Sequence, residues 1–173
     1  MTCCLTSTAF TMPKIHPRYA VGFEAGWGAP YGFGFQAAAL LRPEFEVYSG
    51  LGLNISGFKA GLGARYYYNF NESFALHAGA AYAWSSGVNT INFGIRDKDF
   101  DSIYSYAENN LLHLRTGVRF KQDTLAVLVT TGWGFTQKNA EAHFVSGLDA
   151  YRSAANTFSA GGFELSVAML LYF

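Results

Sequence analysis

The chain has 173 residues, a length that suits a single domain. Asp, Glu, Lys and Arg make up only 14% of it, against roughly 25% in an ordinary soluble protein, so a water-soluble surface is hard to build from this composition. The formal net charge is zero, which excludes the basic footprint of a nucleic-acid-binding protein. No stretch approaches the roughly 20 consecutive apolar residues of a membrane helix, so a membrane form has to be a closed β-sheet.

Residues 1–17 differ from the remainder. They hold both cysteines, Cys3 and Cys4, and they lack the basic start and unbroken apolar stretch of a secretion signal. We interpret them as a leader or a disordered segment. The folded domain is expected over residues 18–173.

From Tyr19 onward, large apolar residues recur at every second position, as in a β-strand with one apolar face. In the first run, Tyr19, Val21, Phe23, Ala25 and Trp27 share a face. Turn residues rich in Gly, Pro, Asn and Asp separate the runs. Eight strands are therefore expected, at residues 19–28, 33–41, 45–53, 58–69, 74–85, 111–121, 124–136 and 163–173.

The connections alternate in length along the chain. Those after the second, fourth and sixth strands are short, whereas the polar segments at about 86–110 and 137–158 are long. Outer-membrane barrels have short periplasmic turns and longer outer loops. The alternation of short and long connections in this chain agrees with that arrangement. Aromatic residues are expected in two girdles. One comprises Trp27, Phe33, Phe58, Trp84, Trp133 and Phe135, and the other Tyr19, Phe45, Phe70, Phe74, Phe120 and Phe173.

The last eleven residues, FELSVAMLLYF, place large apolar side chains at every second position and end on an aromatic residue. This segment resembles the terminal strand of bacterial outer-membrane β-barrels. In that family, the alternating residues and the final Phe are recognised by the barrel-assembly machinery. The resemblance implies that Leu165, Val167, Met169, Leu171 and Phe173 form an assembly signal.

The second face of the strands decides which side points inward. It is mostly Gly and Ala, which suits the narrow interior of a small barrel better than a soluble exterior. A few ionisable residues share this face, and we expect them to form a polar network inside the barrel, where unpaired charges are costly. They are Glu24, Glu46, Lys59, Arg65, His77, His113, Arg115, Arg119 and Glu164. An interior filled in this way predicts no wide pore.

The first long loop contains Asp97, Asp99, Asp101 and Glu108, at positions 1, 3, 5 and 12 of a possible calcium loop. Ser102 stands where that motif requires Gly, and no helices are expected on either side. We therefore favour a solvated acidic loop and predict no metal site. Calcium binding stays open.

The second long loop carries His143, Ser146 and Asp149, residue types that form nucleophile, base and orienting group in some hydrolases. Small barrels that modify lipid A place His and Ser near the outer interface. None of the sequence context of those families surrounds these residues, so we interpret them as ordinary polar loop residues. No enzymatic activity and no cofactor are predicted.

Together, these features predict an all-β, eight-stranded antiparallel up-and-down transmembrane β-barrel that resembles the OmpA transmembrane domain and OmpX. The resemblance implies a monomer in the bacterial outer membrane, in contact with membrane lipids and lipopolysaccharide. Its role would be structural or interactive, through the two long outer loops. A lipid A-modifying enzyme of acyltransferase or deacylase type and a soluble lipocalin-like carrier of a hydrophobic ligand remain as alternatives.

Overall fold

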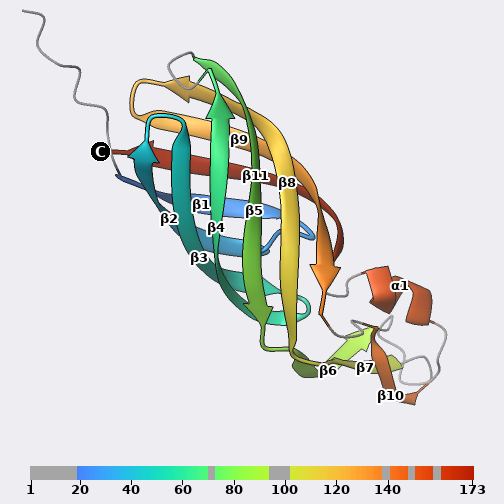
Figure 1. The fold of residues 1–173 in the computed structure, drawn as a ribbon. Coiled ribbons are helices and arrows are strands. Elements are labelled where there is room, and N and C mark those ends of the chain that lie inside the picture. Colours follow the sequence, from blue (N-terminus) through green and yellow to red (C-terminus); the bar gives the residue numbers. More distant parts are fainter. Residues whose placement is uncertain (1–18, 70–72, 94–101, 138–140, 148–150, 158–160) are drawn as a thin grey trace, which may run out of the picture.

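The computed structural model describes residues 19–69, 73–93, 102–137, 141–147, 151–157 and 161–173. Eight long strands in these ranges close into a barrel in which every neighbouring pair is antiparallel (Figure 1). The order around the ring is β1-β11-β9-β8-β5-β4-β3-β2. The barrel strands are β1 (Tyr19–Trp27), β2 (Phe33–Arg42), β3 (Phe45–Asn54), β4 (Gly57–Tyr68), β5 (Phe74–Ser85), β8 (Asn109–Gln122), β9 (Leu125–Thr136) and β11 (Gly162–Tyr172). The predicted eight-stranded architecture is confirmed, with strand ends shifted by one or two residues.

The first and last strands close the ring. Tyr19 and Phe173 exchange backbone hydrogen bonds, with the Phe173 amide 2.9 Å from the Tyr19 carbonyl and the reverse bond 3.3 Å long. The start of β1 and the C-terminus therefore meet at one end of the barrel, called here the terminal end. The turn between β8 and β9 also lies at this end, where Asp123 takes a positive φ of 53° that Asp tolerates in tight turns.

Alternation along each strand sends large apolar side chains outward. Phe35 on β2 is 68% exposed and Leu62, in the middle of β4, is 64% exposed, although both lie within long strands. Small and polar residues of the opposite phase point inward and are buried. The predicted assignment of the two faces is therefore correct.

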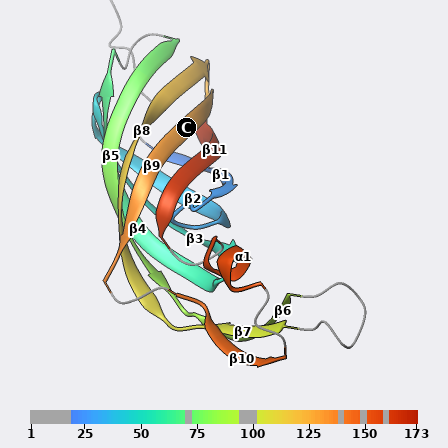
Figure 2. The ribbon, with the colours of Figure 1, turned by 90° about the vertical axis from the view of Figure 1, so that its right-hand side faces the viewer.

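Four short elements were not predicted. They are β6 (Val88–Phe93), β7 (Ser102–Tyr106), β10 (His143–Gly147) and the helix α1 (Arg152–Thr157), all within segments predicted to be irregular loops. The three strands form a separate sheet in the order β10-β7-β6. Figure 2 shows this sheet and α1 beyond the end of the barrel, at the opposite end from the C-terminus. We call this group the lobe, and its end of the barrel the lobe end.

The lobe joins the two long loops, which are far apart in the sequence. Its core comprises Tyr104 and Tyr106 from β7, Ala155 from α1, and Ala142 before β10. Ile91 of β6 and Tyr151 pack against this core. Within the described residues, no helix is both long and apolar enough to cross a membrane.

Candidate functional site

The structure places all nine ionisable residues of the predicted interior network inside the barrel. Each is at most 6% exposed, although they come from six of the eight barrel strands. Closure of the sheet brings them together, because the inward phase of every strand faces the same narrow space. They form two clusters, one in each half of the barrel.

Arg115 of β8 is the centre of the cluster nearer the lobe. Its Nε donates a 2.8 Å hydrogen bond to Oε1 of Glu164, and its Nη2 is ion-paired with both Glu164 and Glu24. The Ser166 hydroxyl donates to Glu24 at 2.9 Å and accepts a hydrogen bond from Nη2 of Arg115. Nδ1 of His113 lies 3.2 Å from Oε2 of Glu164. One guanidinium thus holds two buried carboxylates, from β1 and β11, against β8.

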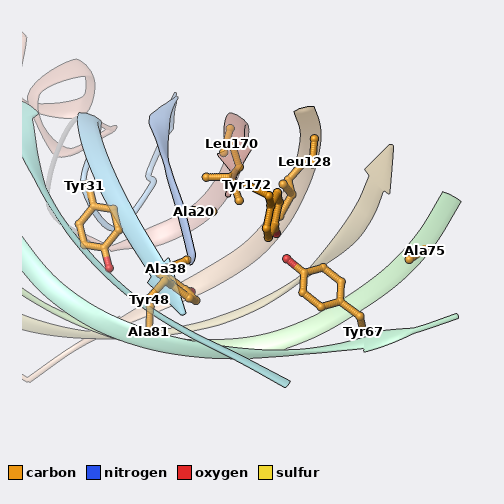
Figure 3. Packing of buried hydrophobic residues seen from close by; sticks show 12 residues of the cluster. Ala20, Tyr31, Ala38, Tyr48, Tyr67, Ala75, Ala81, Leu128, Leu170 and Tyr172 are labelled. Atoms are coloured by element: carbon orange, nitrogen blue, oxygen red, sulfur yellow. The ribbon is translucent and has the colours of Figure 1, made fainter. Parts of the chain in front are cut away.

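Glu46 of β3 is the centre of the cluster in the terminal half. One carboxylate oxygen lies 2.7 Å from Nε of Arg65, and the other accepts a 2.7 Å hydrogen bond from the Tyr172 hydroxyl. The Tyr67 hydroxyl also donates to Glu46, at 3.3 Å. Figure 3 shows the Tyr67 hydroxyl directed toward Tyr172 across the barrel. The lumen is therefore spanned by side chains from opposite walls.

Tyr48 connects the two clusters. The guanidinium carbon of Arg65 lies 4.0 Å from the centre of its ring, a cation–π contact. Nη1 of Arg115 donates to the Tyr48 hydroxyl at 3.1 Å. The two clusters therefore act as one continuous polar network along the barrel axis.

The remaining predicted interior residues have partners outside these two clusters or at their edges. Nζ of Lys59 lies 3.4 Å from the Ala29 carbonyl oxygen, and Nε2 of His77 lies 3.3 Å from the Thr130 hydroxyl. The guanidinium of Arg119 stacks 4.4 Å from the centre of the Tyr67 ring. Sequence reasoning missed the tyrosines of the network because it considered only Glu, Lys, Arg and His. These tyrosines occupy inward-facing positions along β3, β4 and β11, and the alternation of the strands could have identified them.

The lobe is the second candidate site, because it gathers both long loops. The Tyr106 hydroxyl donates a 2.7 Å hydrogen bond to the Ala155 carbonyl, and the Ala142 amide donates to Oδ1 of Asn156 at 2.9 Å. These bonds tie α1 to the sheet. Burial raises the pKa of Tyr106 to about 12, with a smaller contribution from the neighbouring Tyr104.

Strand β10 lies at one edge of the lobe sheet. It pairs with β7, and the register shifts between Phe144 and Ser146. Phe144 is 36% exposed and Val145 is 54% exposed. The lobe therefore presents apolar side chains next to the edge of a short strand.

The other loop residues singled out from the sequence are not assembled into a site in the described part of the chain. His143 and Ser146 lie exposed on β10, while Asp149 lies outside the described residues. Glu108 is exposed, and Asp97, Asp99 and Asp101 also lie outside the described residues. Among the residues that the structure describes, no group of three or more His, Cys, Asp or Glu side chains is suitably placed for a metal ion. Calcium binding stays a prediction.

The apolar outer face and polar interior bear on the lipocalin-like alternative. A carrier of that type needs an apolar cavity inside and a polar surface outside. Here most large apolar side chains point outward, and the interior holds ion pairs together with tyrosines, alanines and the two leucines Leu128 and Leu170. The large apolar side chains thus lie on the opposite side of the strands from the one that a soluble carrier requires, and this alternative stays an untested prediction.

Comparison with known proteins bears on the fold. No protein-family model matches the chain, and no curated protein matches it. Among solved structures, the N-terminal β-barrel domain of OprF from Pseudomonas aeruginosa superposes with a TM-score of 0.54 at 11% identity, over 90% of this chain and 96% of that one. Neisserial surface protein A gives a TM-score of 0.46 at 15% identity, over 90% and 93% of the two chains. The chain thus shares the fold of the OprF barrel domain.

Proposed function

We propose that this chain, a closed barrel with the fold of the OprF N-terminal domain, is an integral protein of the bacterial outer membrane that presents its lobe at the cell surface for interaction. The observation that carries the proposal is the outward apolar face, which continues around the whole ring between its two ends. Burying this face in lipid removes it from water, and ring closure leaves no unpaired strand edge in the hydrocarbon.

Aromatic side chains support this placement. Trp27, Phe33, Phe58, Trp84, Trp133 and Phe135 are all exposed near the lobe end, and Tyr19, Phe45, Phe74, Phe120 and Phe173 are exposed near the terminal end. Phe70 lies outside the described residues. Amphipathic and aromatic rings favour the two membrane interfaces, so their positions match the boundaries of a spanning barrel.

The polar network supports a barrel closed to large solutes. Arg65, Glu46 and Tyr172 cross the lumen in one half, and Arg115 joins Glu24 to Glu164 in the other. An eight-stranded barrel has an interior that side chains just fill. We therefore propose a structural and interactive protein rather than a pore, and a monomer, because the ring leaves no barrel strand unpaired.

The lobe is the proposed interaction surface. The short turns at the terminal end offer little area, whereas the lobe carries a sheet, a helix and the exposed Phe144 and Val145. Membrane lipids and lipopolysaccharide surround such a barrel in the proposed location. A further molecule outside the cell would meet the lobe first.

Surface labelling tests the orientation. In a background with Cys3 and Cys4 replaced by Ser, Val145→Cys in the lobe is expected to react with a membrane-impermeant maleimide on intact cells. The matched control is Glu44→Cys, an exposed residue in the turn between β2 and β3 at the terminal end. It is expected to react only after the outer membrane is permeabilised. Equal labelling of the two variants on intact cells would contradict the proposal.

We also propose that the protein is not an enzyme. His143 and Ser146 lie in a strand at the sheet edge, with Phe144 and the register shift between them. Mass spectrometry of lipid A from cells with and without the protein is expected to give the same acyl pattern. A changed pattern that reverts with His143→Ala would establish the lipid A-modifying alternative.

A further inference from the structure

The outer surface of the barrel carries an arginine at the terminal end. Arg42 is the last residue of β2, and it pairs with Phe45 of β3, which in turn pairs with Tyr66 of β4. Residues paired across an antiparallel sheet share a face. Phe45 and Tyr66 are outward and are 36% and 47% exposed, and Arg42 is exposed beside them. Arg42 therefore belongs to the outer surface, next to aromatic rings of the terminal girdle.

This arginine has no protein partner within the described part of the chain. Its guanidinium makes no ion pair, hydrogen bond or ring contact there, not even with Glu44 in the adjacent turn. The Tyr66 ring lies edge-on to the ring of Tyr68, with centres 5.5 Å apart. The hydroxyls of both tyrosines also lack a hydrogen-bond partner among the described residues. One cation and two phenol groups can therefore donate to an acceptor from outside the chain.

A hollow of about 700 Å³ lies beside this row, on the side toward the middle of the barrel. Its floor is formed by short outward side chains that pair across four neighbouring strands: Ala39, Val47, Ala64 and Ala80. On β3 and β4 this floor is two residues, or about 7 Å, from Phe45 and Tyr66. The hollow thus begins next to the arginine row.

Longer side chains form the edges of the hollow. Tyr19 of β1 is 58% exposed, Leu62 of β4 is 64% exposed and Leu112 of β8 is 47% exposed. Outward positions on β11 carry the branched or long residues Val167 and Met169 instead of alanines. The hollow is therefore a local feature of β2 to β5 in the outward apolar belt. Its volume lies within the roughly 300–1,000 Å³ of small-molecule sites.

From these features we infer that this face binds a phospholipid of the leaflet at the terminal end, with the phosphate on Arg42 and an acyl chain in the hollow. A guanidinium group matches phosphate oxygens in charge and in the geometry of its N–H donors. A neutral headgroup would leave Arg42 without a counter-charge. The hollow next to Arg42 selects a ligand in which the anionic group adjoins an apolar chain.

The inference rests on the proposed membrane insertion and adds to it a headgroup chemistry and a place on the barrel. The test uses the full chain folded in dodecyl maltoside micelles. Dimyristoylphosphatidylglycerol is titrated while the backbone amide NMR signals of Phe45, Ala64 and Tyr66 are followed, and saturable shifts are expected. Dimyristoylglycerol, which lacks the phosphate, and inorganic phosphate, which lacks the chains, are expected to give no saturable shift over the same range. Equal saturation with either compound would overturn the inference.

Variants separate the two halves of the site. Arg42→Met is expected to weaken phosphatidylglycerol binding about fivefold, the effect of one arginine at an anionic membrane surface, whereas Arg42→Lys retains most of the binding. The barrel interior is untouched in both variants, because Arg42 lies outside the ring. Ala64→Leu fills the hollow and is expected to weaken binding to a similar extent. Its control, Val167→Leu, enlarges an outward residue that does not line the hollow, and no change is expected.

Unchanged binding in Arg42→Met, or equal losses in Ala64→Leu and Val167→Leu, would overturn the inference. A doubled protein mass in the micelles, measured by light scattering, would assign the hollow to a second copy of the chain and would also overturn it. Failure of the proposed membrane insertion would appear separately, as loss of heat-modifiable gel migration in the parent protein.

Discussion

The barrel and the lobe are held together in different ways. In the barrel, every strand has a neighbour on both sides, the apolar face points outward and the polar face is buried. In the lobe, tyrosine and alanine side chains point inward from three short strands and one short helix. Strands β10 and β6 are the edges of the lobe sheet. The barrel has the polarity expected in lipid, and the lobe has that expected in water. The boundary between these two arrangements lies where β5 and β9 end.

The largest expected effect is on the buried ion pairs of the barrel. Arg115→Met leaves Glu24 and Glu164 in the interior without their cation. Removing one partner of a buried pair costs about 3–5 kcal/mol. Urea unfolding of the protein in lipid vesicles measures this loss. Arg42→Met, at an exposed arginine where β2 ends, is the matched control, and an equal loss in both variants would contradict the interpretation.

The next prediction compares the two exposed surfaces. Leu62→Arg places a charge on the outward face of β4, near the middle of the barrel, and is expected to cost about 2–4 kcal/mol because the charge enters hydrocarbon. Val145→Arg in the lobe changes a side chain that is similarly exposed. It is expected to alter stability by less than about 0.5 kcal/mol, as at an ordinary water-exposed site. Similar costs in the same vesicle unfolding assay would show that the two surfaces face the same solvent.

A smaller effect is expected from the bond that ties the lobe helix to its sheet. Tyr106→Phe removes the hydrogen bond to Ala155 and is expected to cost the lobe about 1 kcal/mol. A fluorophore on Val145→Cys reports lobe opening under denaturant, while the circular dichroism of the barrel strands is expected to stay unchanged. If the barrel signal changes in parallel, the two regions do not unfold separately.

The same tyrosine makes the lobe sensitive to high pH. Burial raises the pKa of Tyr106 from 10.0 to about 12, so the neutral form is favoured in the folded state. Its contribution to stability is present below pH 10 and is lost as the pH rises from 10 to 12. The fluorophore is expected to report this loss in the parent protein and a smaller one in Tyr106→Phe. An unchanged pH profile in the variant would exclude Tyr106 as the source.

The smallest expected effect is kinetic. Phe173→Ala is expected to slow insertion of the barrel, with little change in its final stability, because the resemblance to outer-membrane terminal strands assigns this residue to the assembly signal. Phe163→Ala alters an outward Phe at the other end of the same terminal segment and serves as the control. The measurement is the rate at which the heat-modifiable form appears. Equal rates for both variants would count against the terminal signal.

Sequence patterns were most informative where one physical constraint acts on every residue. Each barrel strand must place alternate side chains on the outside and in the lumen. Alternating runs such as Phe163 to Phe173 therefore indicate the strands and their two faces together. The same phase placed Glu24, Arg115 and Glu164 inside. Which of them pair could not be predicted, because pairing depends on the stagger of strands that are remote in the sequence.

The lobe was missed for the same reason. Its strands β7 and β10 are five residues each and lie about forty residues apart, and neither shows a long alternating run. Short segments of this kind become strands only when they pair with each other. Ser102 and His143 were assigned to loops, because nothing local to either segment indicates its partner.

Alternation was therefore enough to predict an eight-stranded barrel with its apolar side outward, because a period of two that recurs in eight separate runs allows few other folds. The folded arrangement was needed to show that Arg115 bridges two carboxylates and that the long loops share one core around Tyr104 and Tyr106. These features depend on contacts between segments that are remote in the sequence and that meet only when the ring closes.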